Sequence, residues 1–201
     1  MKTHLWTWGL AATLAGVAAA DHPKSYFPLK EGNHWEYTDG FKADVKSALP
    51  TPSGVNYWIN RLSAFAEPKG AVLRPIRHSV RVTIIDHPPA LLYRFKRPAG
   101  STYAVNLQPF PPMTVKVTAK DETVTVPAGT FKKCIRFDFR RPVPLNPGAT
   151  SLVYSQWFAP GVGLVKQMHS TGAIPGAIAP RLLKRARINW KWIGSTPVDG
   201  N

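Results

Sequence analysis

Alternation of apolar and polar residues along much of the chain predicts short antiparallel strands. A period of two places neighbouring side chains on opposite faces of a sheet, so one face of each such strand is apolar and the other polar. Arg and Lys are frequent among the polar positions. The clearest apolar sets are Val80, Val82 and Ile84; Leu91, Tyr93 and Phe95; Ile135, Phe137 and Phe139; and Ala186, Ile188, Trp190 and Trp192.

Turn-forming residues separate these alternating stretches. The 20 Pro and 15 Gly are spread through the chain, and no single linker divides it, which indicates one β-rich domain over 21–201. Lys120 and Asp121 are expected to form the turn of a hairpin. The expected strands are 34–38, 56–65, 77–85, 91–96, 102–107, 114–119, 122–126, 132–140, 151–158, 164–170 and 185–193.

The predicted fold class is all-β and mainly antiparallel, with short helices or none. A sheet with one apolar face hides that face by curling, so we expect a half-barrel or barrel-like sheet. Its interior is either a filled core or a ligand cavity. In the expected last strand, Trp190 and Trp192 share the apolar face with Ala186 and Ile188. Trp190→Ala would then cost about 3–5 kcal/mol, as a large-to-small change in a core.

The first 20 residues have the pattern of an export signal. Lys2 is followed by an apolar run and by small residues that end at Ala20. This run is shorter than the roughly 20 residues of a membrane span, so we expect cleavage after Ala20 rather than an uncleaved anchor. A lipid-modified N-terminus is not expected, because no Cys lies near this site. The mature chain should lie in the periplasm, in the cell envelope or outside the cell, without a transmembrane segment.

The formal net charge of +15 suggests a binding role for the polar face of the sheet. Such an excess favours anionic partners, namely envelope polymers, acidic lipid headgroups or nucleic acid. Export makes nucleic acid an unexpected physiological partner, and the charge could also serve solubility alone. The residues of the expected anion-contact face are Arg77, Arg81, Arg94, Lys96, Arg136, Arg140, Arg185, Arg187 and Lys191.

Three phrases in the chain occur together in a known group of proteins. They are YFPLKEGNHWEY at 26–37, VTVPAGTF at 124–131 with Cys134 after it, and WFAPGVGLVK at 157–166. The combination resembles uncharacterised bacterial secreted proteins and lipoproteins that share a domain of unknown function. Phe158 stands where that group has Tyr, and the lipid-bearing Cys of its lipoprotein members is missing. The resemblance implies a curled antiparallel sheet, similar to lipoprotein-carrier half-barrels, and brings no established activity.

The same phrases have plain structural interpretations. Gly129 and Gly161 suit turns that need a positive φ or a close approach of the backbone. Large aromatic side chains most often serve burial, so Trp35, Tyr37 and Trp157 are expected in the core rather than against a ligand.

Candidate catalytic residues are scarce. The His residues are isolated and have no zinc-binding spacing, and no nucleophile elbow or phosphate loop occurs. Asp121 and Glu122 are expected at a solvated hairpin tip rather than as an acid/base pair. Cys134 is the sole cysteine, which prevents an internal disulfide and indicates a part-buried small residue. We therefore expect no enzyme, no cofactor and no metal.

Three functions remain open from the sequence. The first is a non-catalytic envelope protein that binds an apolar or amphiphilic ligand, such as a lipid, or a partner protein in or along the curled sheet. The alternative is an interaction module that docks on anionic envelope surfaces or polymers through its basic face. A hydrolase of envelope polymers has the least support. An apolar cavity of several hundred cubic ångströms would favour the first function, and a filled interior the second.

Overall fold

The computed structural model describes residues 26–61, 70–77, 79–84, 86–143, 146–169 and 180–194. The expected export signal and His78 lie outside these residues, as does most of the expected strand end at 60–65.

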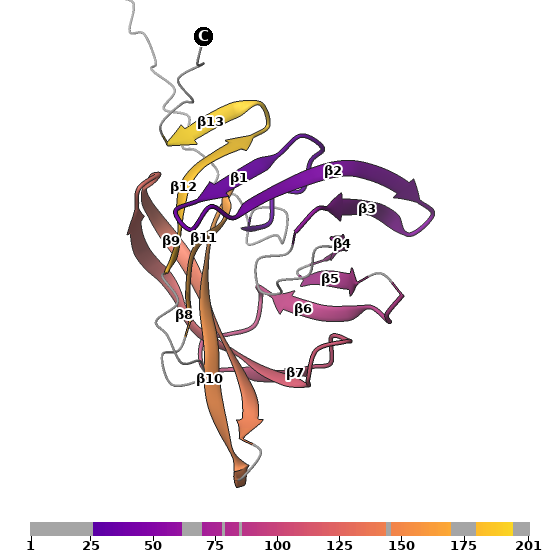
Figure 1. The fold of residues 1–201 in the computed structure, drawn as a ribbon, viewed down its shortest axis with the longest axis vertical. Coiled ribbons are helices and arrows are strands. Elements are labelled where there is room, and N and C mark those ends of the chain that lie inside the picture. Colours follow the sequence, from indigo (N-terminus) through magenta and orange to yellow (C-terminus); the bar gives the residue numbers. More distant parts are fainter. Residues whose placement is uncertain are drawn as a thin grey trace, which may run out of the picture.

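Within the described residues the chain is built almost entirely of strands (Figure 1). Essentially no helix occurs in this part of the chain, as the alternating pattern predicts. The strands are β1 (His34–Tyr37), β2 (Lys42–Thr51), β3 (Gly54–Ile59), β4 (Ala71–Ile76), β5 (Ser79–Ile84), β6 (Ala90–Arg94), β7 (Thr102–Val105), β8 (Met113–Val126), β9 (Gly129–Val143), β10 (Asn146–Ala159), β11 (Gly163–His169), β12 (Arg181–Ile188) and β13 (Lys191–Gly194).

One antiparallel sheet contains all of these strands and curls until it is nearly closed into a barrel. Its order is β6-β5-β4-β3-β2-β1-β12-β11-β10-β9-β8-β7, and β13 pairs with β12 beside this path. The pairing of β1 with β12 joins the N-terminal strands to the C-terminal ones. The edge strands β6 and β7 approach each other, since the Tyr103 hydroxyl donates to the Leu92 carbonyl at 2.8 Å. The predicted fold class is confirmed.

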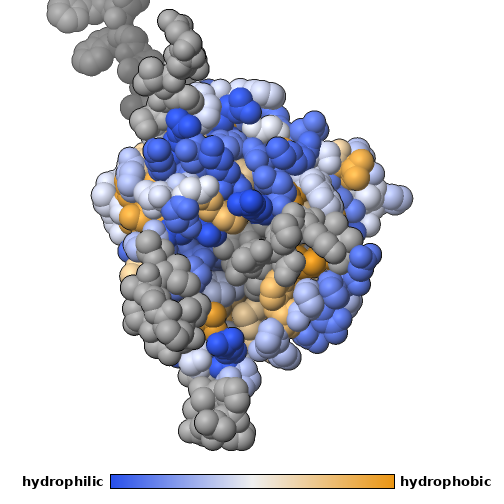
Figure 2. All heavy atoms as spheres, in the orientation of Figure 1, coloured by the Kyte–Doolittle hydropathy of each residue, from blue (hydrophilic) through white to orange (hydrophobic). Residues whose placement is uncertain are grey.

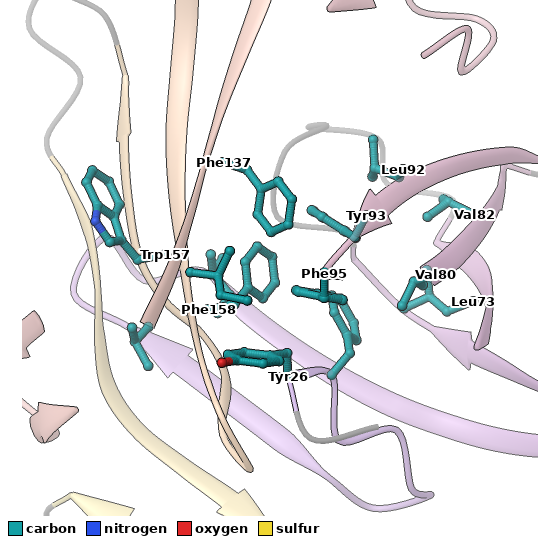
Figure 3. Packing of buried hydrophobic residues seen from close by; sticks show 14 of the residues in the cluster. Tyr26, Leu73, Val80, Val82, Leu92, Tyr93, Phe95, Phe137, Trp157 and Phe158 are labelled. Atoms are coloured by element: carbon teal, nitrogen blue, oxygen red, sulfur yellow. The ribbon is translucent and has the colours of Figure 1, made fainter. Parts of the chain in front are cut away.

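The interior is occupied by aromatic side chains from both halves of the sheet. The Phe158 ring of β10 lies 4.8 Å from that of Tyr93 and 5.6 Å from that of Phe95, measured between centroids. Phe137 of β9 also contacts these rings (Figure 3). Tyr26, from the segment before β1, stacks on Phe95 at 5.3 Å. These contacts between distant segments tie the two halves of the sheet together.

The first and third of the shared phrases contact each other. Trp35 Nε1 donates to the Val162 carbonyl at 2.6 Å, and the Tyr37 hydroxyl donates to the Leu164 carbonyl at 3.0 Å. Gly163, at φ 96°, lies against the Trp35 indole, where a Cβ would come within 3.4 Å of Nε1. Trp35 and Tyr37 are buried as expected. The phrases therefore have a structural role in joining β1 to β11.

Alternation predicted the faces of two strands correctly. Val80, Val82 and Ile84 of β5 are buried, and so are Ile135, Phe137 and Phe139 of β9. Gly129 and Gly161 have φ values of 134° and 71°, as their turn positions required. In β6 a register shift changes the pattern, so that Leu92 is buried in place of Leu91.

The expected hairpin at Lys120 and Asp121 is wrong. Both residues lie inside β8, which continues to Val126 and turns only afterwards into β9. Asp121 has a φ of 64° and lies where the register with β9 shifts, which marks a β-bulge. A bulge and a turn both use a residue in the left-handed region. This explains why the sequence at Asp121 predicts a hairpin turn where the structure has a bulge. Asp121 and Glu122 are therefore not at a hairpin tip.

The expected last strand is two strands. β12 ends at Ile188, which pairs with Lys191 of β13, so Asn189 and Trp190 form a two-residue turn. Trp190 is 67% exposed and Trp192 36% exposed, whereas Ala186 and Ile188 are buried. The expectation that both Trp side chains pack inward is wrong, and so is the large cost expected for Trp190→Ala.

Candidate functional site

The described interior leaves little room for a ligand. A cavity between the first and third phrases has a volume of about 30 Å³ and is lined by Phe27, Trp35, Tyr37, Ala43, Ile59, Arg61, Gly163 and Leu164. That volume suits a water molecule rather than an acyl chain.

A polar chain crosses the packed interior. The Tyr93 hydroxyl donates to Gln156 Oε1 at 2.9 Å, and Gln156 Nε2 donates to Gln167 Oε1 at 2.8 Å. Gln167 Nε2 then lies 2.9 Å from His169 Nε2. Burial lowers the pKa of His169, and the positive charge of Arg181 lowers it further. These hydrogen bonds give the buried side-chain amides of Gln156 and Gln167 their partners. The lowered pKa favours the neutral form of the His169 imidazole.

The outer side of β1, β2 and β12 carries a charged network. Glu36 accepts a hydrogen bond from Arg185 Nε at 2.8 Å, and His34 Nδ1 lies 2.7 Å from Asp44 Oδ1. Asn60 Nδ2 donates to the other Asp44 oxygen at 2.9 Å. Burial alone would raise the pKa of Glu36, but the hydrogen bond and charge of Arg185 outweigh it and hold that pKa below its usual value.

This network predicts a loss of stability in acid. A carboxyl group with a lowered pKa in the folded state contributes stability that is present above its unfolded pKa, about 4.3 for Glu. That stability is lost as the pH falls through the folded pKa. We expect the unfolding midpoint of the protein in urea to fall more steeply between pH 5 and pH 3 than that of Glu36→Gln. Parallel pH profiles for the two proteins would contradict this assignment.

A groove lies where the segment before β1 meets β2 and the β12–β13 hairpin. It has a volume of about 480 Å³ and is lined by Lys30, Glu31, Gly32, Asp44, Val45, Lys46, Arg187 and Trp190. Hydrophilic side chains gather over this end of the molecule in Figure 2. The groove is much larger than the interior cavity, and five of its eight lining residues are charged.

Two Trp side chains and two Arg side chains alternate beside this groove. The Arg187 guanidinium lies 5.3 Å from the Trp190 ring centre and 5.8 Å from that of Trp192. Arg185 lies 5.7 Å from the Trp192 ring centre, and His34 meets that ring edge-on. Cation–π contacts of this kind hold the rings without burying them.

A second polar cluster lies farther along the outer side, on β9 and β10. Arg136 Nε donates to Asp138 Oδ1 at 2.8 Å, and Ser155 Oγ donates to the same oxygen at 2.7 Å. Trp157 is buried as expected but points away from the aromatic core (Figure 3). Arg136 and Lys166 lie at 5.0 and 4.9 Å from its ring centre.

The structure places the nine residues of the expected anion-contact face in three groups. Arg185, Arg187 and Lys191 lie together on β12 and β13, and Arg136 and Arg140 lie on β9. β10 and β11 separate these two groups. The other four residues lie on or beside β5 and β6, at the far end of the strand order: Arg77, Arg81, Arg94 and Lys96.

Sequence reasoning missed the groove and its exposed Trp190. Lys30, Lys46 and Arg187 come from three separate segments, and only the pairing of β1 with β2 and β12 brings these together. The sequence did contain one signal of the turn at 189–190. Asn189 is a residue type that favours left-handed turn positions.

Cys134 is buried, and burial is the largest cause that raises its thiol pKa to about 11. The negative charge of Glu122 raises that pKa further. A thiol with such a pKa stays protonated at neutral pH and is a poor nucleophile. Among the described residues, no group of three His, Cys, Asp or Glu side chains is placed to hold a metal ion.

In the part of the chain that the structure describes, no helix is long and apolar enough to cross a membrane. No family model matches the chain, and no curated protein matches it. The chain is similar to the structure of a predicted exported protein with a YmcC-like fold from Bacteroides fragilis, at 18% identity and a TM-score of 0.43 over 80% of this chain and 98% of that one. It is also similar to a predicted lipoprotein from Parabacteroides distasonis, at 14% identity and a TM-score of 0.42 over 80% of this chain and 97% of that one.

Proposed function

We propose that this protein is a non-catalytic exported module that docks on an anionic surface of the cell envelope through the outer side of its sheet. One observation carries the proposal. The interior is filled by side chains of both halves of the sheet, whereas the groups of Arg and Lys lie on the outer side.

The filled interior favours docking over the binding of an amphiphile inside the sheet. Sites for small molecules usually have volumes of about 300–1,000 Å³. The interior cavity of about 30 Å³ is an order of magnitude smaller. Elsewhere in the interior, the ring of Phe158 contacts those of Tyr93 and Phe95.

The charges support an anionic partner. Carboxylates neutralise several outer cations, as Asp138 does for Arg136 and Glu36 does for Arg185. The formal net charge of +15 nevertheless leaves a large positive excess over these pairs. Such an excess raises the local concentration of anionic surfaces around the protein and speeds encounter with them.

The proposal predicts binding that depends on lipid charge and on salt. We expect the mature protein to cosediment with phosphatidylglycerol vesicles at low salt and to leave them at moderate salt, because exposed charges are screened over about 8–10 Å at physiological ionic strength. The protein should not cosediment with vesicles of phosphatidylcholine. The same assay with an acidic polysaccharide tests the other kind of anionic surface.

The triple variant Arg185→Gln, Arg187→Gln, Lys191→Gln should lose most of this binding. Arg97→Gln is a single-charge control, since Arg97 is exposed just after β6, at the far end of the strand order from the hairpin. Binding that depended on neither the lipid charge nor the salt concentration would contradict the proposal.

A further inference from the structure

The turn between β12 and β13 holds an unusual residue. Asn189 and Trp190 have φ values of 49° and 67°, so both lie in the left-handed region that a two-residue hairpin turn of this type requires. Asn adopts this region readily, whereas a bulky residue such as Trp does so at a cost. Gly is the favoured residue at the second position of such a turn. Backbone strain of this kind is concentrated at functional sites.

The strained residue is also strongly exposed. The Trp190 side chain is 67% exposed, the largest fraction among the exposed large hydrophobic residues of the described chain. Its six-membered ring lies against Gly32, where an added Cβ would come within 3.2 Å of Cη2. Asn33 Oδ1 accepts a hydrogen bond from the Asn189 amide at 2.9 Å and fixes the turn on the segment before β1. The ring is thus held in place while it remains open to solvent.

Arg187, beside this ring, has unused hydrogen-bonding capacity. Its Nη2 donates to the Gly32 carbonyl at a long 3.3 Å, and its buried Nε has no hydrogen-bond partner among the described residues. Within this part of the chain, no carboxylate forms an ion pair with Arg187, in contrast to Arg136, Arg181 and Arg185. A guanidinium that lines a groove without a carboxylate partner among the described residues suits a phosphate group.

Other charges around the groove leave an excess of cations. Lys30 and Lys46 line it together with Arg187, and Lys191 is exposed on the adjacent strand. Glu31 and Asp44 also line it, and Asp44 pairs with Lys46, so the lining keeps an excess of one cation, three against two. An exposed ring surrounded by cations is complementary to an anionic bilayer, where Trp favours the headgroup level and each nearby Lys or Arg adds attraction.

We propose that the β12–β13 hairpin is a membrane anchor that places Trp190 in the interfacial region of an anionic phospholipid bilayer. Arg187 and Lys30 then contact lipid phosphates from the groove. This inference rests on the proposed docking function and names both its surface and the element that touches it. A bare acidic polymer would attract the cations equally well but would give the apolar Trp190 ring no apolar phase to enter.

The test measures partitioning of the mature protein into phosphatidylglycerol vesicles at low salt. Trp190→Ala should weaken partitioning about tenfold, because an interfacial Trp buries a large apolar area. Arg187→Gln should weaken it about fivefold, the fold-change that corresponds to about 1 kcal/mol per cation near an anionic surface. Leu49→Ala is the matched control, since Leu49 is exposed on a different hairpin, and it should partition as the unchanged protein does.

A second readout reports insertion itself. Binding of the unchanged protein should shift Trp fluorescence to the blue, and this shift should be absent in Trp190→Ala. Normal partitioning of both variants, or binding without a blue shift, would overturn the anchor while leaving docking by another part of the outer side intact. Binding to the acidic polysaccharide alone would also overturn the anchor. If the protein bound neither vesicles nor polymer, the docking function itself would fail.

Discussion

Replacing Phe158 by Ala is expected to lower the free energy of unfolding by about 3–5 kcal/mol, as a large-to-small change in a packed core. The Phe158 ring contacts the rings of Phe27, Tyr93, Phe95 and Phe137, which come from segments far apart in the chain. Its removal would leave a void between the two halves of the sheet, where neighbouring strands cannot easily move to fill it.

Urea unfolding followed by circular dichroism measures this loss. Trp190→Ala is the informative control, since it also truncates a large aromatic residue but at an exposed position, and it should change the free energy of unfolding by under about 0.5 kcal/mol. Similar losses in the two variants would mean that the interior is not the packed core described above.

The second large effect is expected at Gln156. Gln156→Met keeps the length of the side chain but removes the hydrogen bonds to the Tyr93 hydroxyl and to the Gln167 amide. Because both partners lie in the dry interior, each loss costs about 1–3 kcal/mol. We expect the free energy of unfolding to fall by about 2–6 kcal/mol in total.

A double-mutant cycle separates this effect from simple packing. Tyr93→Phe removes only one hydroxyl and should cost about 1 kcal/mol. Adding it to Gln156→Met should cost less than the sum of the two, because the hydrogen bond between these side chains can be lost only once. Strict additivity would show that the two groups are not coupled.

Alternation identified the strands in which it is uninterrupted. β9 carries Ile135, Phe137 and Phe139 toward the interior and Arg136 away from it, which the period of two predicts directly. Alternation failed in the last strand, because a two-residue turn shifts the phase of the pattern. Ile188 pairs with Lys191 and Arg187 pairs with Trp192, so Trp192 lies on the face of Arg187 rather than on that of Ile188.

Two strands escaped prediction because they contain proline. Pro50 made the end of β2 resemble a loop, and Pro75 did the same for β4. Pro75 is tolerated because β3 pairs only with Ala71, Val72 and Leu73, so β4 has no partner on that side at its later residues. The positions at which β4 lacks a neighbouring strand cannot be derived from the amino-acid sequence.

The candidate site could be predicted only in part. Arg185 and Arg187 follow from the alternating pattern, since they lie on the polar phase. Lys191 does not, because it pairs with Ile188 and lies on the other face of the hairpin. The groove does not, because Gly32 and Arg187, which both line it, are 155 residues apart in sequence. The exposure of Trp190 depends on a turn that the pattern concealed.

Hydrogen exchange of the mature protein with and without phosphatidylglycerol vesicles tests most directly whether the outer side is the functional surface. The account predicts slower exchange on binding at the amides of the β12–β13 turn and of Glu31 and Gly32, with no change at the core strands β9 and β10. Faster exchange in the core strands, as an opening interior would give, would contradict it, and so would protection confined to segments away from the hairpin.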